Sequence, residues 1–262
     1  MSIHTSTYIL VYSLIVAFLL GAVFGSFLNC AAVRIVNKES VVKGRSHCMS
    51  CGHVLGVLDL IPLFSWLFLG GKCRYCKAKV PARYFLAELF MAVMTLLCVL
   101  RFDLSFLTLR NFILLCCLFA LSMVDIDSMI IPNVFIIIPI AAWAAYIPLA
   151  EKPLIYLRDG LIAGAVFGVG VLLVSLIMDK LLKKESLGGG DIKLFFVMGL
   201  YLGLINGLLA MILSCIFGLI FVFAFKKKRK EPFPFGPSIS LATWICLLAG
   251  DFVTGWYLGL FS

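Results

Sequence analysis

The stretch Leu187-Gly188-Gly189-Gly190-Asp191-Ile192-Lys193 places three consecutive glycines and a carboxylate where a long apolar run begins. Glycine accepts backbone angles that are closed to other residues, and it lets another segment approach the main chain closely. Asp191 occupies the N-cap position of the helix that the apolar run predicts. Taken alone, this is an ordinary helix start. A second acidic cluster, Asp125-Ile126-Asp127, at the edge of another apolar run, indicates a shared site.

The composition is that of an integral membrane protein. The 262 residues are 63% hydrophobic and 13% charged, with a mean hydropathy of +1.13, which excludes a soluble domain of this length. Long unbroken apolar runs also exclude the alternating strands of a membrane barrel. Measured against the roughly 20-residue helix that crosses a bilayer, they predict an all-α polytopic membrane protein with about eight transmembrane helices. The runs cover residues 8–29, 84–100, 106–124, 130–150, 160–178, 192–204, 207–225 and 239–260.

The net charge of +9 follows from membrane topology, and we expect no nucleic-acid partner. Eighteen of the 22 Lys and Arg fall in alternate loops, including the basic run 226–230, which we expect to face anionic membrane lipid. The positive-inside rule makes these loops cytoplasmic and both termini external. Asp125 and Asp191 then lie at the cytoplasmic ends of their helices. The loops predicted to face the other side carry the remaining cations, Arg101, Arg110, Lys152 and Arg158.

Residues 34–83, between the first helix (1–33) and a seven-helix membrane domain (84–262), form the only sizeable polar insert. So short a segment buries little core of its own. Its Cys-x-x-Cys pairs have the spacing of a four-thiolate structural zinc site. The alternatives are a disulfide framework, which is disfavoured on the reducing side of the membrane, redox pairs and unligated thiols. The predicted zinc ligands are Cys48, Cys51, Cys73 and Cys76.

Between the two cysteine pairs, residues 58–71 (LDLIPLFSWLFLGG) are strongly apolar. They are too few to cross a bilayer but enough to lie on it. We therefore expect this part of the insert to rest on the membrane surface. Glu88, about one turn inside the second apolar run, is a functional candidate because ionisable groups are rare there. Pairing with Arg83 or Tyr84 would be a purely structural use.

Two carboxylates at hydrogen-bonding distance share one proton, because the first charge opposes the second ionisation. Such a pair supplies a base that activates water and an acid that protonates the leaving group, which is the chemistry of aspartic peptide hydrolysis. Residues at i and i+2 of a helix do not share a face, so at most one of Asp125 and Asp127 faces Asp191. The alternative is a proton- or metal-coupled transporter that uses Asp125 and Asp191 as a relay.

These motifs resemble those of the bacterial type IV prepilin peptidases, membrane enzymes that are also N-methyltransferases, over nearly the whole chain. Gly188 to Asp191 looks like the family's Gly-x-Gly-Asp motif and implies Asp191 as one catalytic aspartate. Asp125, followed by Ile131-Pro132-Asn133, looks like the other. The resemblance implies supporting roles for Asp127, Gly188, Gly190 and Lys193. The segments 25–29, Ile61-Pro62 with Ser65-Trp66, the four cysteines and Arg83-Tyr84 with Glu88 follow the family pattern in order.

The resemblance implies a reaction in two steps at the cytoplasmic face of the bacterial inner membrane. The leader of a prepilin or pseudopilin is cut after a glycine, and the new N-terminal amine is then methylated with S-adenosylmethionine. No Rossmann-type glycine fingerprint is present, so the methyl transfer depends on the resemblance alone, which implies a site that includes Gly71, Lys72, Arg83 and Glu88. A non-enzymatic scaffold for pilus or secretion assembly is a third hypothesis. The sequence does not identify the pilin or decide whether the protein forms a homo-oligomer.

Overall fold

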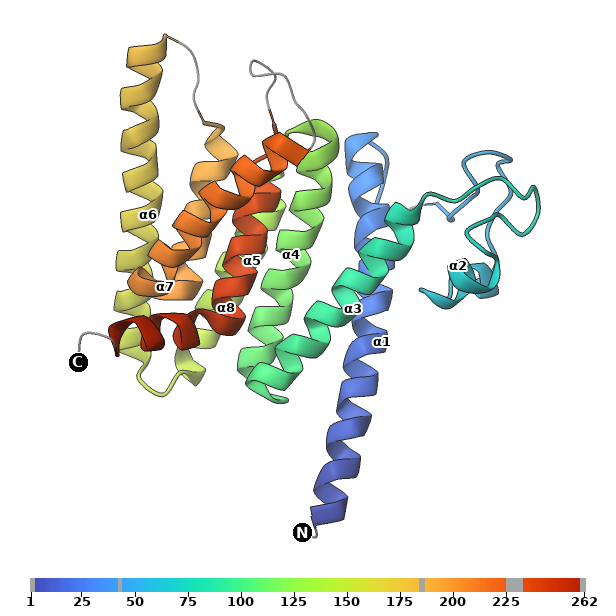
Figure 1. Ribbon diagram of the computed structural model, residues 1–262, viewed down its shortest axis with the longest axis horizontal. Helices are drawn as coiled ribbons and strands as arrows, with labels where there is room; N and C mark the ends of the chain where they lie inside the picture. The colour runs from blue at the N-terminus through green and yellow to red at the C-terminus, as the bar shows by residue number, and fades with distance from the viewer. Residues whose placement is uncertain (1–2, 42–43, 184–186, 225–232, 260–262) are drawn as a thin grey trace. The chain divides into compact units, whose positions relative to one another are not determined.

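The computed structural model describes residues 3–41, 44–183, 187–224 and 233–259, and over these residues the regular structure is helical, as predicted (Figure 1). The basic run 226–230 lies outside the described residues. The helices are α1 (Ile3–Val36), α2 (Phe64–Phe68), α3 (Ala82–Phe102), α4 (Phe106–Ser128), α5 (Val134–Tyr146), α6 (Pro153–Leu182), α7 (Gly189–Ala224) and α8 (Gly236–Leu258), with short 3-10 turns η1 (Val57–Asp59) and η2 (Ile147–Leu149).

Among the described residues, six helices are long and apolar enough to cross a membrane: α1, α3, α4, α6, α7 and α8. The predicted run 130–150 forms a shorter helix, because α5 has 13 residues before η2 continues it. The predicted runs 192–204 and 207–225 both belong to α7. They are separated at Gly203, whose φ of 70° and ψ of −170° interrupt the helical backbone.

The chain reverses direction at Gly203. In the first half of α7, the Phe196 side chain lies beside Gly168, whereas the Leu200 carbonyl lies beside Gly160, so this half is antiparallel to α6. Beyond the break, Gly207 lies against Phe167, which shows that the chain has turned back along α6. Figure 1 shows the two halves of α7 as arms of a hairpin. The two apolar runs are therefore separate passes joined by a very tight turn, as the sequence predicted.

The chain divides into two compact units, residues 1–108 and 109–262. In the first unit, α1 and α3 approach closely because α1 carries glycines at their contact. A Cβ at Gly21 would lie 2.5 Å from the Met91 carbonyl oxygen, and one at Gly25 would lie 2.8 Å from that of Ala87. Small residues allow this kind of close approach between membrane helices. The insert between the two helices contains the cysteine pairs, η1 and α2.

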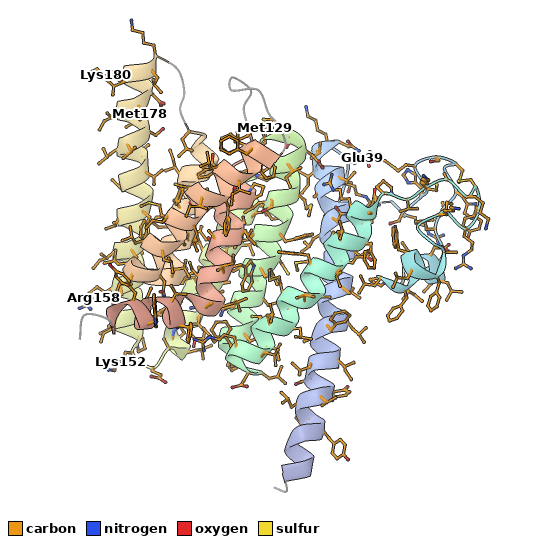
Figure 2. All side chains as sticks on the ribbon, in the orientation of Figure 1. Glu39, Met129, Lys152, Arg158, Met178 and Lys180 are labelled. Carbon is orange, nitrogen blue, oxygen red and sulfur yellow. The ribbon has the colours of Figure 1, made fainter. Side chains whose placement is uncertain are left out.

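Of the six candidate spans, α4 is the most buried: its side chains Leu114, Leu115, Leu118 and Leu121 are at most 1% exposed. Figure 2 shows Met129, which follows α4, at the same end of this unit as Lys180, whereas Lys152 and Arg158 lie at the opposite end. Lys180 and the pair Lys152 and Arg158, which the sequence assigned to different sides of the membrane, thus lie at opposite ends of this unit.

A buried cation joins four helices of the second unit. Arg110 on α4 is 7% exposed and donates hydrogen bonds to the Asn111 side-chain oxygen at 3.0 and 2.8 Å. Its guanidinium carbon lies 4.8 to 5.7 Å from the ring centres of three tyrosines, one each on α5, α6 and α7. Electron-rich ring faces stabilise a desolvated cation. The three rings belong to Tyr146, Tyr156 and Tyr201.

Candidate active site

Asp125 lies in the last turn of α4 and is 5% exposed. Its Oδ2 atom accepts a hydrogen bond of 2.9 Å from the backbone N–H of Gly236, the first residue of α8. The approach is so close that a Cβ at position 236 would lie 2.7 Å from the same oxygen. The first turn of α8 therefore fixes the Asp125 carboxylate, and a side chain at position 236 would displace it.

Asp191 lies in the first turn of α7, where its backbone N–H donates to the Gly188 carbonyl at 3.0 Å. Its Oδ1 atom is enclosed and has no hydrogen-bond partner among the described residues. The carboxylates of Asp191 and Asp125 are close enough to interact electrostatically. The fold thus brings together two acids that are 66 positions apart in the sequence.

The turn after α4 packs against the glycine hinge before Asp191. A Cβ at Gly190 would lie 2.8 Å from the Cβ of Ile131, so this glycine gives the turn the space it occupies. Lys193 Nζ donates a hydrogen bond of 2.9 Å to the Asn133 side-chain oxygen. Gly190 and Lys193, which the resemblance implied as support, both contact the segment that follows Asp125.

The other two predicted supporting residues lie differently. A Cβ at Gly188 would lie 3.2 Å from Asp191 Oδ2, so Gly188 leaves room for that carboxylate. Asp127 is exposed, whereas Asp125 is buried, which agrees with the rule that residues two apart on a helix point in different directions. Of Asp125 and Asp127, Asp125 is the one that faces the interior of the unit.

Sequence reasoning did not find the role of Gly236. The neighbouring Phe235 has its ring centre 6.1 Å from that of Phe195 on α7, and a Cβ at Gly218 would lie 2.9 Å from the Phe235 ring. These aromatic contacts fix the start of α8 beside Asp125. A glycine between Phe235 and Pro237 at a helix start is the signal that could have indicated a close backbone approach.

The four predicted metal ligands converge in the insert. The Sγ atoms of Cys48, Cys51, Cys73 and Cys76 all lie within 4.8 Å of one another. Four thiolates at about 2.3 Å from a tetrahedral zinc ion are themselves about 3.8 Å apart, so this donor set fits the ion. The four-cysteine cluster predicted from the spacing is confirmed.

The two Cys-x-x-Cys loops share one backbone pattern. In the first, the Cys48 carbonyl accepts from the Gly52 N–H at 2.8 Å, and in the second the Cys73 carbonyl accepts from the Lys77 N–H at 3.0 Å. The residue after each pair has a positive φ, 70° at Gly52 and 59° at Lys77. Both loops therefore make the same backbone turn, although only the first has the glycine that this conformation favours.

Asp59 ties the second cysteine loop to η1. Its carboxylate accepts hydrogen bonds from Arg74 Nε at 2.6 Å, Tyr75 Oη at 3.1 Å and the Gly56 N–H at 3.1 Å. The Arg74 guanidinium holds the pKa of the Asp59 carboxyl below its usual range. Asp59 is therefore charged at neutral pH and holds both residues between Cys73 and Cys76 in place.

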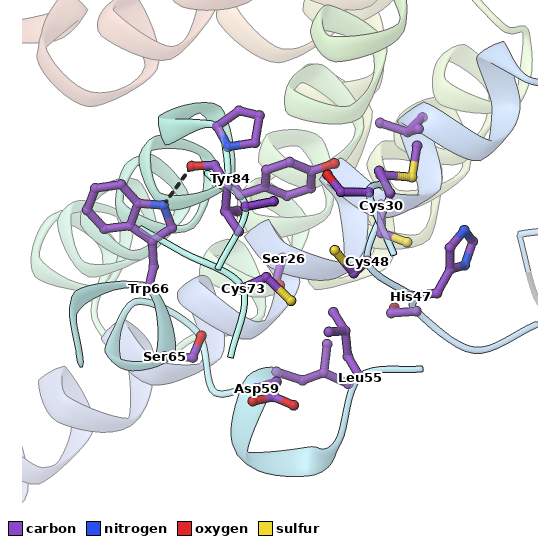
Figure 3. A pocket seen from close by; sticks show the side chains of 18 of the residues that line it. Ser26, Cys30, His47, Cys48, Leu55, Asp59, Ser65, Trp66, Cys73 and Tyr84 are labelled. Carbon is purple, nitrogen blue, oxygen red and sulfur yellow. Dashed lines mark hydrogen bonds between the residues drawn. The ribbon is translucent and has the colours of Figure 1, made fainter. Parts of the chain in front are cut away.

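A pocket of about 430 Å³ lies between the cysteine loops and the adjoining ends of α1 and α3 (Figure 3). Small-molecule sites commonly occupy about 300–1,000 Å³. Among the predicted methyltransferase residues, Lys72 and Glu88 line this pocket, whereas Gly71 and Arg83 are not among its lining residues. Gly71 supports the wall, because its N–H donates to the Trp66 carbonyl at 2.9 Å and a Cβ there would lie 2.8 Å from the Trp66 ring.

Comparisons with known proteins agree with this geometry. Residues 19–102 match the bacterial peptidase A24 N-terminal domain, and residues 112–223 match the type IV leader peptidase family. The chain is 31% identical to a prepilin leader peptidase/N-methyltransferase of Bacillus subtilis over 249 residues. This alignment covers 93% of this chain and 97% of the relative. A relative with the same name in Pseudomonas aeruginosa is 32% identical, and the alignment covers 92% of this chain and 91% of the relative. Another in Aeromonas salmonicida is 35% identical, and the alignment covers 82% of this chain and 74% of the relative.

The fold and the site define a polytopic helical membrane protein with two neighbouring aspartates and a four-cysteine insert. The comparisons place it more narrowly: the chain belongs to the type IV leader peptidase family. Asp125 and Asp191 fall in the region that matches the family profile, and the four cysteines fall in the region that matches the N-terminal domain. No solved structure matches the chain significantly.

The glycine hinge provides a test of how the site is assembled. Gly190→Ala should lower the melting temperature in detergent by several degrees, because the added methyl group overlaps Ile131. Gly189→Ala is the matched control, since a Cβ at Gly189 meets nothing within 4 Å. Equal melting temperatures for the two variants, measured by tryptophan fluorescence, would contradict the packing of the turn against the hinge.

Proposed function

We propose that the protein removes the leader peptide of a type IV prepilin or pseudopilin by aspartic hydrolysis and then methylates the new N-terminal amine. The observation that carries the first step is the pairing of Asp125 with Asp191, both largely enclosed and within electrostatic reach. The printed names of the relatives combine the same two activities. Enclosing two carboxylates is costly unless the charge is compensated or used, which supports a catalytic role.

The surroundings of the two acids differ, and the difference suggests a division of roles. The Gly236 N–H at the start of α8 donates to Asp125, which favours a charge on that carboxylate. Asp191 Oδ1 lacks a donor among the described residues and is available to hold the shared proton. Asp125 accordingly acts as the base that accepts a proton from water, and Asp191 protonates the leaving amine.

The insert is the proposed site of the methyl transfer. Its pocket of about 430 Å³ has the size of a small-molecule site, and its lining contains several cations, among them Lys72, and several acids, among them Glu88. These are the charges that a ligand with a carboxylate and a sulfonium group, such as S-adenosylmethionine, would pair with. Gly71 supports the pocket wall, and Arg83 lies one residue before Tyr84, which lines the pocket.

Zinc is the proposed resident metal of the cysteine cluster. Cys48 and Cys73 also line the pocket, so the metal site and the pocket share a wall. The metal would hold the two loops together in an insert that has few buried apolar side chains of its own. Its role is structural, because four protein thiolates complete a tetrahedral shell and leave no position for a substrate.

The proposed orientation places the insert and the two acids on the cytoplasmic side of the bacterial inner membrane. It follows from the charge distribution, with Lys180 at the end of the second unit that carries Met129 and with Lys152 and Arg158 at the other end. Leader removal at this face would act on a prepilin before its export.

Replacing either member of the acid pair should abolish cleavage. Asp125→Asn and Asp191→Asn preserve the size of each side chain but remove the group that shares the proton, so we expect losses of at least about a hundredfold. The measurement is mass spectrometry of the N-terminus of a co-expressed prepilin, with membrane levels of each variant as a check on folding. The control is Asp159→Asn, an exposed acid paired with its neighbour Arg158. Full cleavage by both variants would contradict the assignment.

The two activities should separate in a pocket variant. Lys72→Ala is expected to leave leader cleavage intact and to yield a mature N-terminus without the methyl group, because the pocket loses the cation proposed to pair with the carboxylate of the methyl donor. Titration calorimetry with S-adenosylmethionine should show weaker binding than in Lys180→Ala, which removes an exposed lysine from α6. Normal methylation by the Lys72 variant would exclude this pocket as the methyl-donor site and would leave the peptidase proposal intact.

The metal content tests the cysteine cluster directly. Purified protein should contain about one zinc per chain, and Cys73→Ser should lose it, because three thiolates bind zinc more weakly than four. Cys215→Ser, which replaces an exposed cysteine of α7 outside the cluster, should keep the metal. Metal-free wild-type protein, analysed by inductively coupled plasma mass spectrometry, would refute zinc.

A further inference from the structure

The apolar segment between the two cysteine pairs does not simply extend into water. Residues 60–71 contain no charged side chain, and they include α2. In the structure the segment folds back toward the two membrane helices of its own unit, α1 and α3. Its apex is Leu63, whose side chain is 6% exposed.

Leu63 reaches the middle of the neighbouring helices. It forms a buried cluster with Ala22 of α1 and Ala92 of α3. Ala92 lies at the midpoint of α3, which has 21 residues and is therefore about 31 Å long. This length only just covers a hydrocarbon core of about 30 Å, so the midpoint of α3 must lie deep in the bilayer. The apex of the segment consequently lies well below the membrane surface.

The backbone of the segment is suited to a medium without water. Within a bilayer, N–H groups must find partners in the protein. Here the chain turns tightly, so the donors find carbonyl groups within a few residues. Those that do so are the N–H groups of Leu60, Phe64, Ser65, Leu67, Leu69, Gly70, Gly71 and Lys72.

The apex itself is held by a membrane carboxylate. Leu63 has φ 64° and ψ −54°, an unfavourable conformation for a residue with a side chain. This conformation points its N–H at Glu88 Oε2, 2.7 Å away on α3. Glu88 is 9% exposed, so its position inside the membrane helix is explained by a specific partner in the insert.

The two sides of α2 meet different surroundings. On one side, Trp66 stacks on Phe85 of α3 at 4.9 Å between ring centres and donates to the Val80 carbonyl at 3.3 Å. The other side presents only apolar groups: Phe64, Leu67 and Phe68 are 47%, 55% and 86% exposed. At the depth set by Leu63, the medium around these three side chains is hydrocarbon.

We propose that residues 60–69 form a re-entrant loop, which enters the bilayer from the side of the cysteine loops and returns to the same side, with lipid acyl chains covering Phe64, Leu67 and Phe68. This position is deeper than the surface location expected from the sequence. The inference concerns membrane insertion and does not depend on the proposed reactions. One consequence is that the pocket, which Trp66 and Glu88 line, borders the interior of the membrane.

Photocrosslinking in lipid nanodiscs tests the proposal. The variant Phe68→p-benzoylphenylalanine, in nanodiscs of phosphatidylethanolamine and phosphatidylglycerol, should form lipid adducts several-fold more often than Met49→p-benzoylphenylalanine. Met49 is the matched control because it is similarly exposed, at 72%, but lies in the first cysteine loop. Tandem mass spectrometry should locate the adducts on acyl chains. Equal yields at the two positions, or adducts confined to headgroups, would overturn the proposal.

A second pair of variants uses the cost of placing a charge in hydrocarbon. Phe68→Asp should lower the melting temperature in nanodiscs by several degrees, although the native side chain makes few protein contacts, whereas Met49→Asp should leave it nearly unchanged. A polar replacement at an 86% exposed position would be neutral in water. Unchanged melting of the Phe68 variant would therefore place the loop outside the membrane.

Discussion

The cost of enclosing a charged carboxylate in a membrane protein constrains the rest of this structure. Asp125, Asp191 and Glu88 each lie at least partly enclosed on a membrane helix, where an unpaired charge is unfavourable. Two of them receive a backbone N–H from a distant segment: Gly236 donates to Asp125 and Leu63 donates to Glu88. In each case a change of chain direction brings the donor to the acid. The third, Asp191, has an oxygen without such a partner among the described residues, and it is the acid that the proposed mechanism leaves available for proton transfer.

Glycine allows these approaches. At Gly236 and Gly190, a Cβ would overlap the Asp125 carboxylate and Ile131, respectively. At Gly25, a Cβ would overlap the backbone of the helix that carries Glu88. The same property serves both units: a side chain is absent where another backbone or a functional carboxylate must lie. Each site therefore depends on both kinds of residue: the acid accepts the hydrogen bond, and the glycine leaves the space that the close approach requires.

The sequence predicted those features that depend on local pattern. Apolar runs identified the helices, and the spacing of Cys48, Cys51, Cys73 and Cys76 identified a cluster that the fold assembles. Charge at the helix ends predicted that Asp125 and Asp191 face the same side of the membrane, and the structure packs the turn after Asp125 against the hinge before Asp191. The donors could not be predicted, because Gly236 is 111 positions from Asp125 and Leu63 is 25 from Glu88. Such pairs are set by tertiary packing, which hydropathy and motif spacing do not encode.

The reversal of α7 at Gly203 limits how far the arm that carries Asp191 can reach across the membrane. The arm that begins at Gly189 ends at this break, so its 14 residues extend about 21 Å, whereas the hydrocarbon core measures about 30 Å. An arm of this length cannot cross the core alone, so at least one of its two ends lies below the membrane surface, against neighbouring helices such as α6, whose 30 residues are enough to cross. In the proposed mechanism Asp191 is the recessed end, and a peptide bond at the edge of a substrate's membrane segment would reach it without the whole segment leaving the lipid.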